Sequence, residues 1–402
     1  MTARRLLQAL PALVLCCATA AFAVDGDEPA DAVPPADAAP PAPTAMASPT
    51  MSYPLTANPK PMSFDFGPLG TAYVTGVLTG LAYAQSNEVP GDRSSRADLS
   101  NGQIIVQTTD GVVQYYIQAG GYSLPALGTP YLTASDTVDA LYGLVPTAYL
   151  KIVPNAAFSL QLGKFPTLIG AEYTFTFQNP NVERGLLWNQ ENAISRGVQA
   201  NYTNGPVAAS IAWTDGFYSN RYSWLSGSLA YTFDPANILG FVYGGNTDRT
   251  THVTSATPLL QNNSQILNII YTHTGGAWTF EPYVQFTRVP KSSELGTLRS
   301  ASTWGAALLV NYAFNPQFSL AGRAEYIDSS GNATNGAPNL LYGPGSNAWS
   351  FTLTPSWQIE RFFARVDLSY VKVGSETPGL VFGDSGTNTS QSRVMVEAGL
   401  LF

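Results

Sequence analysis

The final ten residues of the chain alternate between apolar positions and polar or small ones. One parity holds Val394, Val396, Ala398, Leu400 and Phe402, and the other holds Arg393, Glu397 and Gly399. Successive side chains of a β-strand point to opposite faces, so this pattern predicts a strand with one wholly apolar face. No hairpin partner follows it, and such a strand left unpaired would be an adhesive edge. We therefore expect it to pair with the first strand and close a barrel.

The same alternation recurs upstream. In residues 348–358 one parity is Trp349, Phe351, Leu353, Pro355 and Trp357, and the other is Ser350, Thr352, Thr354, Ser356 and Gln358. Residues 318–326 and 362–370 repeat the pattern. Runs of about ten residues suit a tilted transmembrane strand, and an apolar face opposite a hydrated one indicates lipid outside and water inside.

Connections between these runs alternate between short and long. Short ones, rich in Gly, Asn, Asp and Pro, fall near 109–111, 154–155, 204–205, 234–237, 275–276, 315–316 and 359–360. Longer ones fall near 85–101, 123–145, 167–194, 216–221, 247–263, 289–299, 329–346 and 374–390. This layout predicts an all-β fold over 62–402, a transmembrane antiparallel up-and-down β-barrel of about 16 strands, with 14 to 18 left open. An even number puts both ends of the barrel on the periplasmic side.

The residues before the barrel divide into two segments. Residues 1–23 have a basic start, an apolar run and Ala21-Phe-Ala23, which is the layout of a secretory signal peptide. Both cysteines, Cys16 and Cys17, lie within it. Residues 24–61 are rich in Pro and Ala and contain few large apolar side chains, so we expect a disordered periplasmic tail.

Composition narrows the class of protein. Only 11% of residues are charged, yet mean hydropathy is +0.01. After the signal peptide no apolar run reaches the roughly 18 residues that a spanning helix needs. An exported chain that suits lipid without such helices is expected to be a closed barrel in the outer membrane of a Gram-negative bacterium. The net charge of −8 gives no support for nucleic-acid binding.

Three stretches resemble a known family. They are Leu162-Gly-Lys-Phe-Pro-Thr-Leu-Ile-Gly-Ala-Glu172, Arg184-Gly-Leu-Leu187 and Ser195-Arg-Gly-Val198. Together they resemble the OmpL-like β-barrel porin family of bacterial outer membranes, although Thr214-Asp-Gly216 departs from its pattern. The resemblance implies an outer-membrane barrel that passes small solutes, and it implies no catalytic role.

The long connection at 167–194 is a candidate constriction loop, because loops of this length without secondary structure usually serve a function. In a chain poor in charge it carries a group of ionisable residues at or beside it: Glu172, Glu183, Arg184, Glu191 and Arg196. One interpretation folds the loop into the barrel mouth, where these charges set a field across the pore. The other keeps it on the surface, held by its own salt bridges.

Charged residues at inward parity are candidates for the pore lining. They are Lys151, Glu281, Arg323, Glu325, Arg365, Asp367, Arg393 and Glu397. Arg or Lys facing lipid at the membrane midplane would cost roughly 2–4 kcal/mol, which favours the water-filled side. They are expected either to act on solutes or to form charge ladders that stiffen the wall.

The sequence offers little for chemistry. Its two histidines, His252 and His273, stand in no recognisable catalytic motif, and no metal or cofactor fingerprint is present. We expect a porin that allows passive diffusion of small polar solutes or ions, with no enzymatic step and no cofactor. A plugged structural or adhesive barrel and, less favoured, an outer-membrane hydrolase are the alternatives. Expected partners are outer-membrane lipid and small solutes, and assembly into a homo-oligomer is left open.

Overall fold

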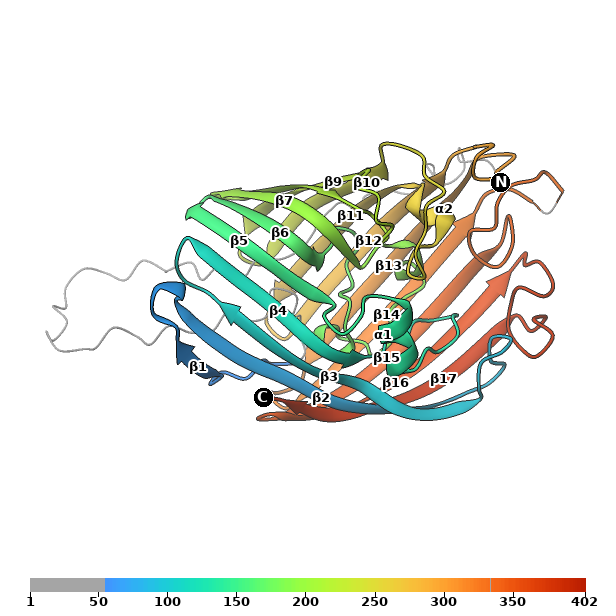
Figure 1. The fold of residues 1–402 in the computed structure, drawn as a ribbon. Coiled ribbons are helices and arrows are strands. Elements are labelled where there is room, and N and C mark those ends of the chain that lie inside the picture. Colours follow the sequence, from blue (N-terminus) through green and yellow to red (C-terminus); the bar gives the residue numbers. More distant parts are fainter. Residues whose placement is uncertain (1–54, 333) are drawn as a thin grey trace, which may run out of the picture.

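A computed structural model describes residues 55–332 and 334–402. The predicted signal peptide and most of the predicted tail lie outside this range. The described part contains a ring of sixteen antiparallel strands and one short additional strand, which confirms the predicted fold class (Figure 1).

The ring consists of β2 (Thr71–Gln85), β3 (Ser95–Thr108), β4 (Val113–Tyr122), β5 (Thr147–Asn155), β6 (Phe158–Pro166), β7 (Ile194–Asn204), β8 (Val207–Thr214), β9 (Trp224–Asp234), β10 (Asn237–Asn246), β11 (Gln265–Gly275), β12 (Trp278–Val289), β13 (Ala301–Ala313), β14 (Phe318–Ser329), β15 (Asn347–Ile359), β16 (Phe362–Gly374) and β17 (Ser390–Leu401). The remaining elements are β1 (Met62–Asp65), α1 (Ala134–Ala140), α2 (Leu259–Asn262) and the 3-10 turns Gly67–Leu69, Thr176–Gln178 and Trp188–Gln190. Each strand from β2 to β16 pairs with the next along the chain, so every hairpin is local in sequence.

The ring closes where the last strand meets the first. β17 pairs with β2 over a register that runs from Arg393 opposite Gln85 to Leu401 opposite Val77. Beyond it, the backbones of Phe402 and Gly76 exchange two N–H···O hydrogen bonds of 2.6 and 2.9 Å. The predicted pairing of the last strand is therefore confirmed.

β1 completes this closure seam. β2 begins before the point at which β17 ends, and its first residues pair instead with β1, Met62 opposite Val74 and Asp65 opposite Thr71. β1 thus continues the line of β17 along the same edge of β2. The Phe402 ring packs against Gly76, where a Cβ would lie 2.4 Å from a ring carbon, so this close approach needs glycine.

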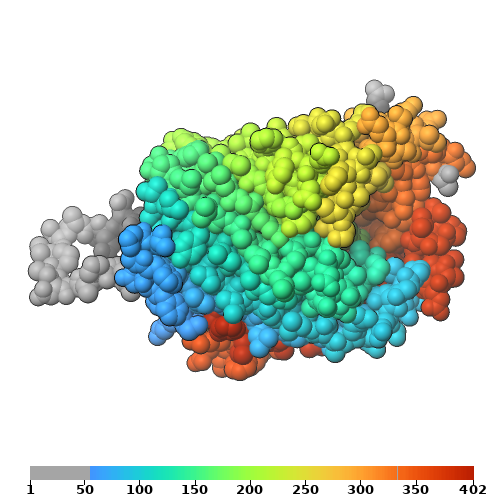
Figure 2. Space-filling view, viewed as in Figure 1, coloured from blue at the N-terminus to red at the C-terminus, as the bar shows by residue number. Residues whose placement is uncertain are grey.

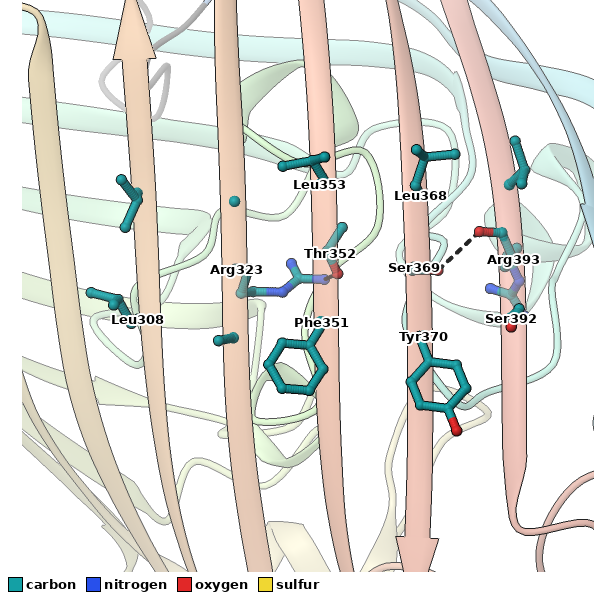
Figure 3. A pocket seen from close by; sticks show the side chains of 14 residues that line it. Leu308, Arg323, Phe351, Thr352, Leu353, Leu368, Ser369, Tyr370, Ser392 and Arg393 are labelled. Carbon is teal, nitrogen blue, oxygen red and sulfur yellow. Dashed lines mark hydrogen bonds between the residues drawn. The ribbon is translucent and has the colours of Figure 1, made fainter.

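Side chains alternate between the two faces of the wall as predicted. On β14 to β17, Phe351, Leu353, Leu368 and Tyr370 project from the outer face, where they border a shallow apolar hollow (Figure 3). Arg323 on the neighbouring strand β14 extends to the inner side, where it donates a hydrogen bond to Thr352. An apolar outer surface over a polar inner one is the arrangement of a membrane-spanning barrel.

Turns and loops separate to opposite ends of the barrel. We call these the short-turn end and the long-loop end. β1 and the chain's last residue lie at the short-turn end, whereas α1 and α2 belong to loops at the other (Figure 1). Figure 2 shows segments distant in sequence gathered at the long-loop end.

Helices contribute little to the described residues. None of them is long and apolar enough to cross a membrane.

Candidate functional site

The connection between β6 and β7, residues 167–193, lies inside the barrel. Its side chains from Phe175 to Leu187 are almost fully buried, and it contacts strands on the far side of the ring. We call it the inner loop. Polar contacts anchor it to β14, β16 and β17, so it crosses the lumen from the wall that carries it to the opposite one.

Two carboxylates on the far wall bind the backbone of the inner loop. Glu325 accepts hydrogen bonds from the N–H groups of Leu186 and Leu187, at 2.9 and 3.2 Å. Asp367 Oδ2 accepts from the N–H groups of Val182 and Glu183, both at 2.8 Å. A buried loop has peptide groups that water cannot reach, and these carboxylates satisfy four of them.

Three arginines complete the anchoring. Arg323 pairs with Glu172 at 2.5 Å and with Glu325 at 3.3 Å, and also donates to the Glu183 carbonyl. Arg365 pairs with Glu397 at 2.6 Å and donates to the carbonyls of Thr176 and Asn179. Arg393 pairs with Glu183 at 2.5 Å. Because these pairs are desolvated, losing one partner would leave an uncompensated charge, which makes the network sensitive to single substitutions.

Two ionisable groups of the inner loop are less well satisfied. Arg184 donates one hydrogen bond to the Pro125 carbonyl, and its Nε and second terminal nitrogen have no hydrogen-bond partner among the described residues. Burial lowers the pKa of Arg184 to about 10. Neither carboxylate oxygen of Glu191 has a well-formed hydrogen bond in the described structure, and the side chain lies beside Gly170 and Tyr283. Burial, reinforced by the carboxylates of Glu172 and Glu325, raises the pKa of Glu191 well above its usual value.

Apolar packing fills the space around these charges. Leu186 and Leu187 of the inner loop join a buried cluster with inward side chains of β9 to β16, among them Trp224, Ile266 and Tyr283. These contacts make the inner loop a packed element, because a loop attached only through polar groups would gain little burial.

The eight predicted pore-lining charges fall into two groups. Arg323, Glu325, Arg365, Asp367, Arg393 and Glu397 point inward but are covered by the inner loop or its contacts, each at most 3% exposed. Lys151 on β5 and Glu281 on β12 point inward and are half-buried. Glu281 accepts a hydrogen bond of 3.2 Å from Thr272, and Lys151 has no ion pair within the described ranges.

The five predicted constriction residues are not all brought together. Glu172, Glu183, Arg184 and Glu191 lie in the inner loop. Arg196 lies outside the inner loop, because it belongs to β7 and its parity is opposite to that of the inward Gln199. It pairs instead with Asp215 at 2.6 Å and lies over the Tyr218 ring.

A wall of uncharged polar side chains escaped the sequence analysis. On β6 to β8, Gln199 donates to Gln161 at 3.0 Å and to Asn201 at 2.8 Å, and Ser210 donates to Asn201 at 2.8 Å. Gln161, Asn201 and Ser210 are only half-buried. The sequence signal that could have indicated this polar wall is the shared inward parity of these uncharged side chains.

The histidines have ordinary partners. The ring of His252 hydrogen bonds to the Ser219 carbonyl at 2.6 Å, and that of His273 to the Asn237 side chain at 2.8 Å. The described residues hold no group of three or more His, Cys, Asp or Glu side chains arranged for a metal ion.

Comparison with known proteins shows the family to which this barrel belongs. The family model described as "Putative beta-barrel porin-2, OmpL-like" matches residues 71–402. The chain belongs to this family. No curated protein matches it in sequence. The family match confirms the resemblance inferred from the motifs around the inner loop, and it covers the whole ring of strands.

Solved structures share the fold at low sequence identity. The anion-selective porin from Comamonas acidovorans has a TM-score of 0.56 and 13% identity, over 82% of this chain and 99% of that one. OmpF of Salmonella typhi, in complex with daunomycin, has a TM-score of 0.55 and 11% identity, over 85% and 100%. The outer membrane channel DcaP of Acinetobacter baumannii has 0.54 and 10%, over 82% and 97%. At such identities the likeness concerns the fold, which is that of porins.

Removing the Asp367 carboxylate should release the inner loop. We expect Asp367→Ala to weaken its docking by about 1–3 kcal/mol for each of the two buried N–H groups left unpaired. Arg184 is the one Lys or Arg in residues 167–193, so trypsin cleavage there reports the release. The control is Asp384→Ala, at an exposed loop position. Equal resistance of both variants, each with a folded barrel by heat-dependent gel migration, would contradict this anchoring.

Docking of the inner loop should weaken with rising pH. A raised pKa means that Glu191 binds its proton more tightly in the docked loop than in a released one. Docking is therefore strongest below the ordinary pKa of a glutamate and weakens as pH rises from that value toward the raised one. We expect cleavage at Arg184, normalised to a free peptide of the same sequence, to increase between about pH 5 and pH 9. Glu191→Gln should flatten this profile, and an unchanged profile would rule out this titration.

Proposed function

We propose that this protein is an outer-membrane porin for passive diffusion of small polar solutes or ions, with the inner loop as its constriction. The observation that carries the proposal is the course of that loop, which crosses the lumen and is fixed to the far wall by Glu325 and Asp367. A constriction needs a fixed element, because a mobile loop would not set a constant pore size.

The proposed route follows the wall that the inner loop leaves uncovered. Many inward side chains toward the short-turn end of β5 to β12 are half-buried, unlike the inward charges of β14 to β17. They include Lys151, Gln161, Asn201, Ser210, Ser228, Thr272 and Glu281. Amides and hydroxyls can exchange hydrogen bonds with a passing solute and replace its lost water, so this lining suits small polar molecules.

Lys151 and Glu281 are the proposed charges of this route. β5 and β12 lie on nearly opposite sides of the ring, and each residue is a few positions from a short turn. The two opposite charges would therefore face each other across the lumen near the short-turn end. The buried charges behind the inner loop are largely compensated by their partners, so their influence on a solute would be small.

We further infer that the short-turn end faces the periplasm, which places the predicted tail at 24–61 there. The exposed apolar outer face is expected to contact outer-membrane lipid. Assembly into a homo-oligomer stays a prediction, and chemical cross-linking in membranes would check it.

One observation favours a second candidate, a plugged structural barrel. The apolar cluster around Leu187 and Trp224 joins the inner loop to inward side chains of many strands, which favours a filled lumen. In that case the inner loop would seal the barrel.

A loop deletion separates the two candidates. We expect wild-type protein in planar bilayers to show steady open channels, and a version lacking Gln178 to Gln190 to conduct more because the constriction is gone. Channels that appear only after the deletion would support the plugged barrel. Silence of both folded proteins would contradict a porin, and equal conductance of both would remove the inner loop as the constriction.

Charge substitutions test the proposed lining. In a salt gradient, Lys151→Gln should shift the reversal potential toward cation selectivity and Glu281→Gln toward anion selectivity, since each removes one sign of charge from the route. Lys372→Gln, at an exposed position of β16 near the long-loop end, is the control. Shifts of the same size in all three variants, or in none, would reject this pair as the charges that solutes meet.

A further inference from the structure

Residues 55–61 immediately precede β1, and the first of them, Leu55, is buried inside the barrel. Leu55 is only 5% exposed and belongs to a buried cluster with inward side chains near the short-turn end. Those side chains come from β2, β3, β16 and β17, and they are Val77, Ile105, Phe363 and Leu401. An apolar residue at this depth contributes to a packed core, although the segment belongs to the predicted tail.

The backbone beside Leu55 is bound at two points by a single side chain. The N–H of Thr56 donates to Gln358 Oε1 at 2.8 Å, and the carbonyl of Thr56 accepts from Gln358 Nε2 at 2.9 Å. The Gln358 amide thus pairs with the segment as a neighbouring strand would, satisfying donor and acceptor of one residue together. Gln358 lies at the short-turn end of β15, and its Nε2 also donates to the Glu360 carbonyl.

The other end of the segment is fixed at the closure seam. β1 begins at Met62 and pairs with β2 in the line of β17. Residues 55–61 therefore connect Gln358 on β15 with the seam, and β16 and β17 lie between these two points in the ring. In contrast, Met62 and Phe64 of β1 are more than half exposed, so the burial is specific to Leu55 within residues 55–65.

We propose that residues 55–61 form a latch, a segment of the chain that docks in the short-turn mouth of the barrel and narrows it. Leu55 is its apolar anchor and Gln358 is the residue that recognises its backbone. The inner loop restricts the lumen from the long-loop side, and the latch restricts it from the short-turn side. Docking stands on these contacts alone, whereas its effect on conductance rests on the proposed porin function.

Thiol labelling tests docking without any need for a channel. In a folded full chain with Cys16→Ser and Cys17→Ser, a thiol reagent should label Leu55→Cys about tenfold more slowly than Leu69→Cys, because position 69 is exposed at the same end. Adding Gln358→Ala should speed labelling at position 55 and leave position 69 unchanged. Gln317→Ala, at an exposed neighbouring turn, is the control and should change neither. Equal labelling of positions 55 and 69 in the parent chain would overturn the latch.

Conductance tests its consequence. Leu55→Ala and Gln358→Ala should each give larger single-channel conductance than wild type, and Leu69→Ala and Gln317→Ala should not. Slow labelling at position 55 with conductance unchanged in all four variants would overturn the narrowing. Silent bilayers with every variant would contradict the porin function instead, and labelling would still decide whether the segment docks.

Discussion

The structure depends on one requirement, that every backbone N–H and C=O group facing lipid has a partner within the protein. Fifteen neighbouring strand pairs satisfy it locally, and the pairing of β17 with β2 satisfies the remaining edges. β1 extends the same solution by one short strand, since β2 would otherwise present free peptide groups beyond Phe402. The alternation of side chains follows from closure, because a closed wall has only an outer and an inner face.

Inside the wall, the same requirement acts on the inner loop. A loop placed in the lumen has peptide groups that lack backbone partners. Glu325 and Asp367 of the far wall accept hydrogen bonds from its N–H groups. Their charges are costly to bury alone, which explains why Arg323 and Arg365 stand two residues away from them on the same strands, β14 and β16. Six of the eight charges predicted to line the pore thus contribute first to holding the loop, whereas the uncharged polar side chains of β6 to β8 stay half-buried.

The barrel could be predicted because apolar lipid-facing residues and polar inward-facing residues alternate along each strand, as Leu353 and Thr352 do on β15. The direction of the inner loop could not be predicted from the sequence. Its contacts, such as that of Glu183 with Arg393, join residues far apart in the chain that meet only once the ring has closed. Arg196 was grouped with the loop because it lies beside it in the sequence, whereas its place on β7 directs it to Asp215. Leu55 lay in a stretch whose composition indicates disorder, and a single apolar residue does not change that average.

The closure seam also bears on how the molecule forms. Neighbouring hairpins can pair as soon as both strands exist, but Arg393 must find Gln85, which lies near the opposite end of the chain. Contacts of such long sequence separation form late and slowly. Until then the half-formed sheet has two open edges and an apolar face, which is the combination most prone to aggregation. The final strand is therefore the step at which this chain most needs protection during its biogenesis.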